Sequence, residues 1–143
     1  MKKFKFRLQR VLDVRNRIRD ERRQELVAAN LARDQEAQRL EDLRALSLEQ
    51  RVQEGGTYSA SDLLMFGAYA KRLALEIERQ IERVAEAEAK AEEARQRYVE
   101  ASQDARALEM LEAKRRAEHT ELALKKEGEF LDELSIQRAK REL

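Results

Sequence analysis

Apolar residues recur at alternating spacings of four and three residues through the second half of the chain. Starting at Phe66, twelve of thirteen such positions are apolar, and the exception is Gln80. The positions are Phe66, Ala70, Leu73, Ile77, Gln80, Val84, Ala87, Ala91, Ala94, Tyr98, Ala101, Ala105 and Leu108. An apolar heptad repeat that lasts six heptads predicts a coiled-coil helix.

The heptad positions are no longer apolar after Leu108. The next positions in the repeat are Glu112, Arg115 and His119, which are not apolar. The apolar face that packs in the coiled coil, which we call the seam, is therefore expected to end there. Large apolar residues then return outside that repeat, at Leu122, Leu124, Phe130, Leu131, Leu134 and Ile136.

The first half also has helical spacing, although its apolar frame drifts. The sequence Gly55-Gly56 separates the two halves, and glycine commonly ends a helix. Ser59 followed by Asp62 resembles a capping box, with Ser61 as an alternative N-cap. We therefore expect one all-α domain over residues 1–143, an antiparallel two-helix coiled coil with helices over about 2–53 and 61–140 and a hinge over about 54–60.

Helix lengths extend this prediction. At 1.5 Å per residue the helices would be roughly 75 and 120 Å long. Folding the chain about residue 57 places Phe4 opposite Met110. The second helix from Ala113 onward would then be an overhang without a partner helix.

Composition supports a helical rod and excludes several other classes. The chain has no Pro, Cys or Trp and only four Gly, whereas sandwiches and barrels need Gly and Pro in their turns. Charged residues make up 41% of the chain, but the net charge is only +1, which disfavours disorder. No apolar run approaches the length of a membrane span, and we expect the protein in the cytoplasm.

Catalytic chemistry is not expected. His119 is the single histidine and is predicted to lie on the surface, and one histidine cannot form a multi-histidine metal site. A two-helix rod offers no enclosed pocket for convergent groups. We therefore expect no enzyme activity, no catalytic or metal-binding residues and no cofactor.

Two segments could bind partners. Residues 1–23 carry ten Lys/Arg against three Asp/Glu, a net of +7, which suits an acidic protein surface, an anionic membrane or nucleic acid. We favour the acidic protein surface, because acidic residues interrupt the basic face. Residues 63–77 are rich in large apolar side chains on more than one helical face, which indicates either extra packing or a partner-binding patch.

Three segments of the chain match the pattern of a known family. The chain opens with Phe4-Lys5-Phe6-Arg7-Leu8-Gln9-Arg10-Val11-Leu12, has a Gly-containing turn and an aromatic-bearing helix from Gly55 to Ile77, and carries Leu131-Asp132-Glu133-Leu134-Ser135-Ile136 near its end. The first segment is similar to the Phe-x-Phe-x-Leu-Gln-x-Leu-Leu start of the FliJ family of bacterial flagellar protein export. The other two resemble the middle and the ending of the same family pattern.

The resemblance implies a role that composition does not show. Family members are stalk proteins of the flagellar export apparatus, similar to the coiled-coil stalk of a rotary ATPase. It implies binding to the hexameric export ATPase, to the cytosolic domain of the large export-gate protein and to export chaperones, at the inner face of the cell membrane and without membrane insertion. By motif position, the gate-binding residues are Tyr69, Leu73, Glu76 and Gln80. Candidate residues for binding the ATPase ring lie in the basic N-terminal stretch and the unpaired C-terminal overhang. They are Arg7, Arg10, Arg15, Leu131, Leu134, Ile136 and Arg138.

Two alternative functions fit the same sequence features. The chain could be the analogous stalk of a virulence-type secretion system. It could also be a coiled-coil adaptor whose basic N-terminus binds membranes or nucleic acid.

Overall fold

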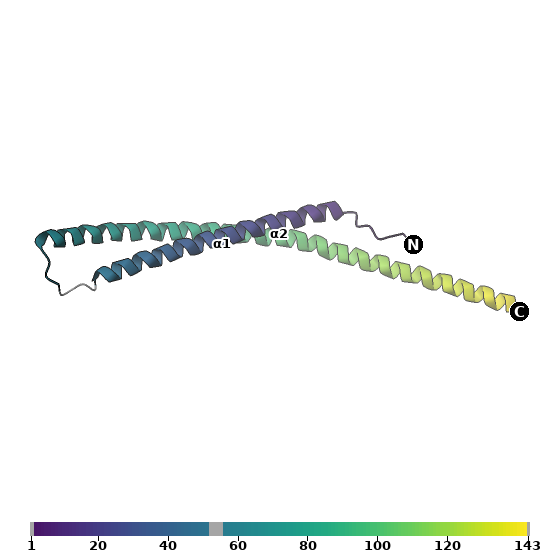
Figure 1. The fold of residues 1–143 in the computed structure, drawn as a ribbon. Helices are drawn as coiled ribbons and strands as arrows, with labels where there is room; N and C mark the ends of the chain where they lie inside the picture. Colours follow the sequence, from purple (N-terminus) through teal and green to yellow (C-terminus); the bar gives the residue numbers. More distant parts are fainter. Residues whose placement is uncertain (1, 52–55, 143) are drawn as a thin grey trace. The chain divides into compact units, whose positions relative to one another are not determined.

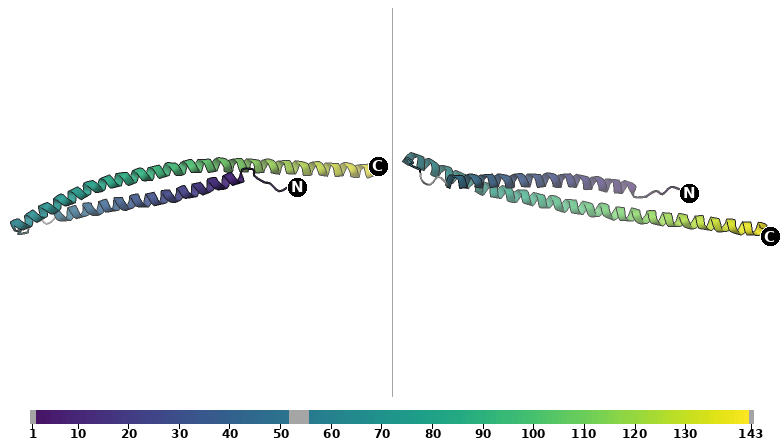
Figure 2. Two further views of the ribbon diagram at one scale, coloured as in Figure 1. Left: turned by 90° about the horizontal axis from the view of Figure 1, so that it is seen from above. Right: turned by 60° about the horizontal axis from the view of Figure 1, so that its bottom comes forward.

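The computed structural model describes residues 2–51 and 56–142, and most of these residues form two helices. Helix α1 spans Gln9–Arg51 and helix α2 spans Ala60–Glu142. The two helices run in opposite directions and pack against each other (Figures 1 and 2). The fold is the all-α helical hairpin that the heptad pattern predicts.

The start of α2 confirms the predicted capping box. The Ser59 backbone N–H donates to Asp62 Oδ2 at 3.3 Å, and the Asp62 N–H donates to Ser59 Oγ at 3.1 Å. These reciprocal bonds satisfy two N–H groups that the first helical turn leaves unpaired. Ser59, rather than Ser61, is the N-cap. The expected end of the first helix near residue 53 and the hinge residue Gly55 lie outside the described residues.

Contacts divide the chain into two compact units, which are described separately. One unit comprises Glu21–Val99. The other comprises the described parts of Met1–Asp20 and Glu100–Leu143.

The unit Glu21–Val99 is a helix pair with a thin core. Leu40, Leu73, Gln80 and Ala91 are buried between the helices. Burial on α2 begins at Leu73, although the heptad repeat begins at Phe66, which is 40% exposed. The α1 side chain that meets this turn is polar: Gln50 Nε2 donates to the Phe66 carbonyl oxygen at 3.0 Å. This pairing provides a hydrogen bond but no apolar cover for the Phe66 ring.

The other unit pairs residues 9–20 of α1 with α2. Leu12, Ala101 and Ala105 form its core, and Ala105 is fully buried. Two ion pairs flank this core: Arg15 Nη1 lies 3.5 Å from Asp104 Oδ2, and Arg19 Nη1 lies 3.1 Å from Glu109 Oε1. Small alanine side chains permit close helix approach but bury little apolar area.

The first residues differ from the prediction, because α1 begins at Gln9 and not near residue 2. Residues 2–6 are not helical, and a turn at Arg7 and Leu8 leads into the helix. Phe4, Phe6 and Leu8 are half-buried, whereas the intervening Lys5 and Arg7 are exposed. This alternation with a period of two is typical of an extended chain.

The extended start also corrects the predicted register. Phe4 packs against His119, with ring centroids 5.5 Å apart, and not against Met110, which is 67% exposed. Leu8 lies beside Leu111. The four residues from Leu8 to Phe4 span about 13 Å when extended, as do eight residues of helix at roughly 12 Å. The N-terminal segment, residues 2–8, therefore covers α2 as far as His119, and the part of α2 without a partner starts later than Ala113.

Candidate interaction surfaces

Gln80 is the polar exception in the heptad repeat and the most buried large side chain of the described residues. It is 1% exposed, and its amide Nε2 donates to the Glu36 carbonyl oxygen at 2.9 Å and to the Glu36 carboxyl oxygen Oε2. A buried polar residue at a seam position fixes the register of a coiled coil at some cost in stability. The sequence does not predict Glu36 as the partner, because the apolar spacing of the first helix is irregular. The single polar position in the heptad repeat does indicate that Gln80 needs a hydrogen-bond partner.

The four nominated gate-binding residues do not form one exposed stripe. Leu73 and Gln80 are buried against α1, whereas Tyr69 and Glu76 are exposed. These four residues share one face of α2 because they are spaced by four, three and four residues. The residues that pack on α1 have the same spacing. Only Tyr69 and Glu76 are accessible to a partner while the helices are paired.

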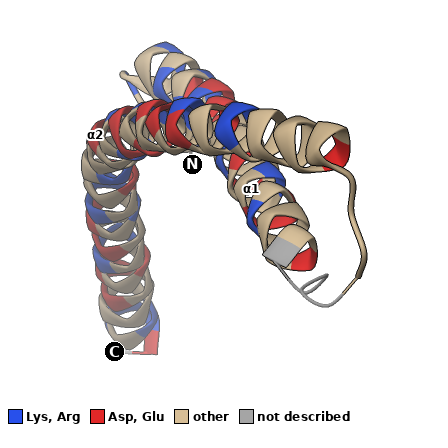
Figure 3. Ribbon diagram, turned by 90° about the vertical axis from the view of Figure 1, so that its left-hand side faces the viewer, with Lys and Arg blue, Asp and Glu red and all other residues tan. Residues whose placement is uncertain are grey.

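The residues before Tyr69 include several more exposed apolar side chains. We define the tip patch as Tyr58, Leu63, Leu64, Met65, Phe66 and Tyr69, all of them exposed. Leu64 and Met65 are 77% and 68% exposed, which is uncommon for large apolar side chains. The first turns of α2 carry no charge between Asp62 and Lys71, in contrast to the mixed charges farther along both helices (Figure 3).

The tip patch is ordered by its aromatic residues. The Tyr58 and Phe66 rings meet edge to face, with centroids 5.2 Å apart. Gly56 lies under the Tyr58 ring, where an added Cβ would come within 2.9 Å of the ring. Glycine at position 56 thus permits Tyr58 to fold back on α2.

The N-terminal segment forms a groove with α2. The groove has a volume of about 390 Å³, and its lining residues are Phe4, Lys5, Phe6, Arg7, Leu8, Leu111, Arg115 and His119. The Arg116 guanidinium lies 5.1 Å from the Phe4 ring centroid and so adds a cation–π contact to the Phe4–His119 pair. His119, predicted as a surface residue, is half-buried in this contact.

The seven nominated ATPase-binding residues fall into two groups on the same unit. Arg7 borders the groove, Arg10 is exposed, and Arg15 pairs with Asp104. The C-terminal group starts at Leu131, about 27 Å farther along α2 than the level of Arg7. The residues of this group, Leu131, Leu134, Ile136 and Arg138, are exposed.

The last part of α2 is an exposed helix, which we call the overhang and define as residues 124–142. Every side chain in it is exposed, and its large apolar residues are 39% to 64% exposed. An isolated helix obtains most of its stability from packing of an apolar face. The overhang thus presents apolar side chains that no other described part of the chain covers.

Within residues 2–51 and 56–142, no helix is long and apolar enough to cross a membrane. The same residues include no group of three His, Cys, Asp or Glu side chains placed to hold a metal ion.

A family model described as Flagellar FliJ protein matches residues 4–143. No curated protein and no solved structure matches the chain. The matched range includes the N-terminal segment from Phe4, the tip patch and the overhang, and it covers nearly the whole chain. The chain therefore belongs to the flagellar FliJ protein family.

Proposed function

We propose that this component of the flagellar export apparatus is a non-enzymatic coiled-coil stalk. In this role it couples the export ATPase ring to the cytosolic domain of the membrane export gate and escorts export chaperones. It would act in the cytoplasm, at the inner face of the cell membrane. Family membership and two exposed apolar surfaces, one on each unit, support the proposal.

The overhang is the observation that carries the proposal. Its apolar side chains are not covered by any other described part of the chain. Such a helix suits insertion into a ring of subunits that supplies the missing contacts. In this model Leu131 and Leu134 provide apolar contact to the ATPase. Arg138 and the N-terminal arginines Arg7 and Arg10 meet acidic loops and mainly speed association.

The tip patch is the proposed gate-binding surface. It includes the exposed residue Tyr69, and the exposed residue Glu76 lies two turns farther along α2. Leu73 and Gln80 contribute indirectly in this model, because they hold α2 against α1 and so keep the exposed side chains in place.

Two double variants test the proposal in a reciprocal design. Leu131→Ala with Leu134→Ala should weaken binding to the purified export ATPase by about tenfold, because two half-covered leucines lose their apolar contact. Leu64→Ala with Tyr69→Ala should weaken binding to the gate domain to a similar degree. Each double variant is the control for the other partner.

If the overhang variant binds the ATPase as tightly as the unmodified chain and remains helical by circular dichroism, the overhang is not the ATPase-binding surface. If the tip-patch variant binds the gate domain unchanged, the tip patch is not the gate-binding surface.

A further inference from the structure

Two apolar side chains of the overhang, Phe130 and Leu134, continue the packed face of α2. On the same unit, one face of α2 carries four half-buried residues, Leu108, Glu112, His119 and Ala123. N-terminal residues meet this face at Glu112 and His119. Further steps of three or four residues from Ala123 lead to Glu127, Phe130 and Leu134. The face that packs on α1 and the N-terminal segment thus carries on into the exposed overhang.

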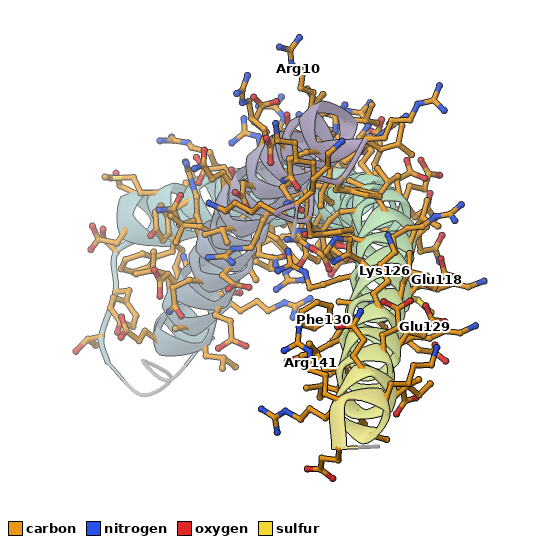
Figure 4. The ribbon with its side chains drawn as sticks, turned by 90° about the vertical axis from the view of Figure 1, so that its right-hand side faces the viewer. Arg10, Glu118, Lys126, Glu129, Phe130 and Arg141 are labelled. Atoms are coloured by element: carbon orange, nitrogen blue, oxygen red, sulfur yellow. The ribbon has the colours of Figure 1, made fainter. Side chains whose placement is uncertain are left out.

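Five residues define this surface, which we call the overhang stripe. With 3.6 residues per turn, they occupy an arc of about 120° on α2. The stripe comprises Leu124, Glu127, Phe130, Leu131 and Leu134. Figure 4 shows Phe130 and Arg141 projecting to one side of α2, with Glu118 and Glu129 on the opposite side.

Two opposite charges lie near the centre of this arc. Arg138 follows Glu127 by eleven residues, which is close to three helical turns and places both on the stripe side. Neither residue has an ion pair within the described chain, whereas several other charged residues of α2 do. A partner that covers the stripe must therefore offer a cation opposite Glu127 and an anion opposite Arg138.

A second copy of the same overhang, placed antiparallel, meets this requirement. With the two-fold axis between Asp132 and Glu133, Leu131 of one copy faces Leu134 of the other. The same alignment sets Glu127 of each copy opposite Arg138 of the other. Asp132 and Glu133 themselves point away from the centre of the stripe, so they do not meet across the axis.

A parallel arrangement fails on the same residues. It would set Glu127 against Glu127 and Arg138 against Arg138 within an apolar interface, and like charges there are destabilising. We propose that the overhang is a self-association surface, on which two copies of this chain pair antiparallel through the overhang stripe. This pairing is a further function of the overhang and needs neither the ATPase nor the gate.

The pairing should be weak and reversible, because the stripe is short and its apolar area is small. It would also cover the side chains that the ATPase is proposed to bind. A chain released from the ATPase would then hide its exposed leucines in a second copy, and the ATPase would displace that copy on binding.

Charge reversal tests the pairing and its direction in the full chain. Sedimentation equilibrium over a wide concentration range should show a monomer–dimer equilibrium for the unmodified chain. Glu127→Arg and Arg138→Glu should each weaken the dimer by about tenfold, because each converts two attractive pairs into two repulsive ones. The double variant, with both changes, should restore the dimer.

Matched controls carry the same charge changes on the opposite face of the helix. Glu129→Arg and Lys125→Glu should leave the dimer unchanged, and circular dichroism should report equal helix content for all variants. A chain that stays monomeric at every concentration overturns the proposal. So does a double variant that remains as weak as the single variants, because antiparallel pairing requires the exchange of charges to restore attraction.

Discussion

The buried pair of Gln80 and Glu36 provides the sharpest prediction about stability. In Gln80→Ala the Gln80 side chain loses two hydrogen bonds, each contributing about 1 kcal/mol net. The change also removes one buried methylene group, worth about 0.8 kcal/mol. We therefore expect Gln80→Ala to lower the free energy of unfolding by about 2–3 kcal/mol.

A second substitution at the same position separates hydrogen bonding from packing. Gln80→Leu keeps the volume of the side chain and replaces a polar group with an apolar one in the seam. The gain in apolar burial offsets most of the lost hydrogen bonding, so the free energy of unfolding should change by less than about 1 kcal/mol. Equal and large losses for both variants would show that the two hydrogen bonds, rather than the filled seam, dominate.

Urea unfolding followed by circular dichroism at 222 nm measures these effects. A double-mutant cycle with Glu36→Ala should give a coupling free energy of about 1 kcal/mol, because only the side-chain bond is removed while the Glu36 carbonyl stays in place. Glu41→Ala is the matched control, since Glu41 is an exposed acidic residue on α1. Loss of less than about 0.5 kcal/mol in Gln80→Ala would refute the burial of Gln80 between the helices.

Three further predictions concern local features. Gly128→Ala should stabilise the overhang helix by about 0.5–1 kcal/mol, measured as helix content on heating, because an added Cβ meets no atom within 4 Å. Phe4→Ala should speed amide exchange in residues 9–12 without changing exchange around Gln80, because it removes the ring contact with His119 that holds the N-terminal segment. A hydrogen bond from Arg95 holds the pKa of Glu92 below its usual value, so Arg95→Ala should raise this pKa in an NMR titration. The small stabilisation from this pair is present at neutral pH and is lost as the pH falls through the pKa of Glu92 in the folded chain.

Much of the fold follows from patterns that depend on one helix alone. The heptad repeat predicts the face of α2 that packs, and the sequence from Ser59 to Asp62 predicts how that helix begins. Both signals are local, because a cap and a repeat are set by neighbours within a few residues of each other. The hairpin itself follows from the turn between two apolar-striped segments.

The structure departs from the prediction in the N-terminal segment, which is extended and not helical. A spacing of four residues from Phe4 to Leu8 fits a helix, but Phe4, Phe6 and Leu8 also alternate with basic residues. The extended form lets this short segment reach His119, whereas a helix would have stopped near Met110. Sequence spacing alone cannot decide between these forms, because the decision depends on which side chains of α2 remain uncovered.

The candidate site shows the same limit. The motif positions of Tyr69, Leu73, Glu76 and Gln80 share one face, and for Leu73 and Gln80 that face is already used by α1. A shared face predicts a common neighbour, but it does not say whether the neighbour is another protein or the other half of the hairpin.

Amide hydrogen exchange of residues 124–142 tests the proposed stalk function most directly. It should be measured at low protein concentration, where self-association is negligible, with and without the purified export ATPase. We predict fast exchange across these residues in the free chain and strong protection when the ATPase binds. Exchange that stays fast in a chain shown to be ATPase-bound would contradict the proposal that the overhang docks in the ATPase ring.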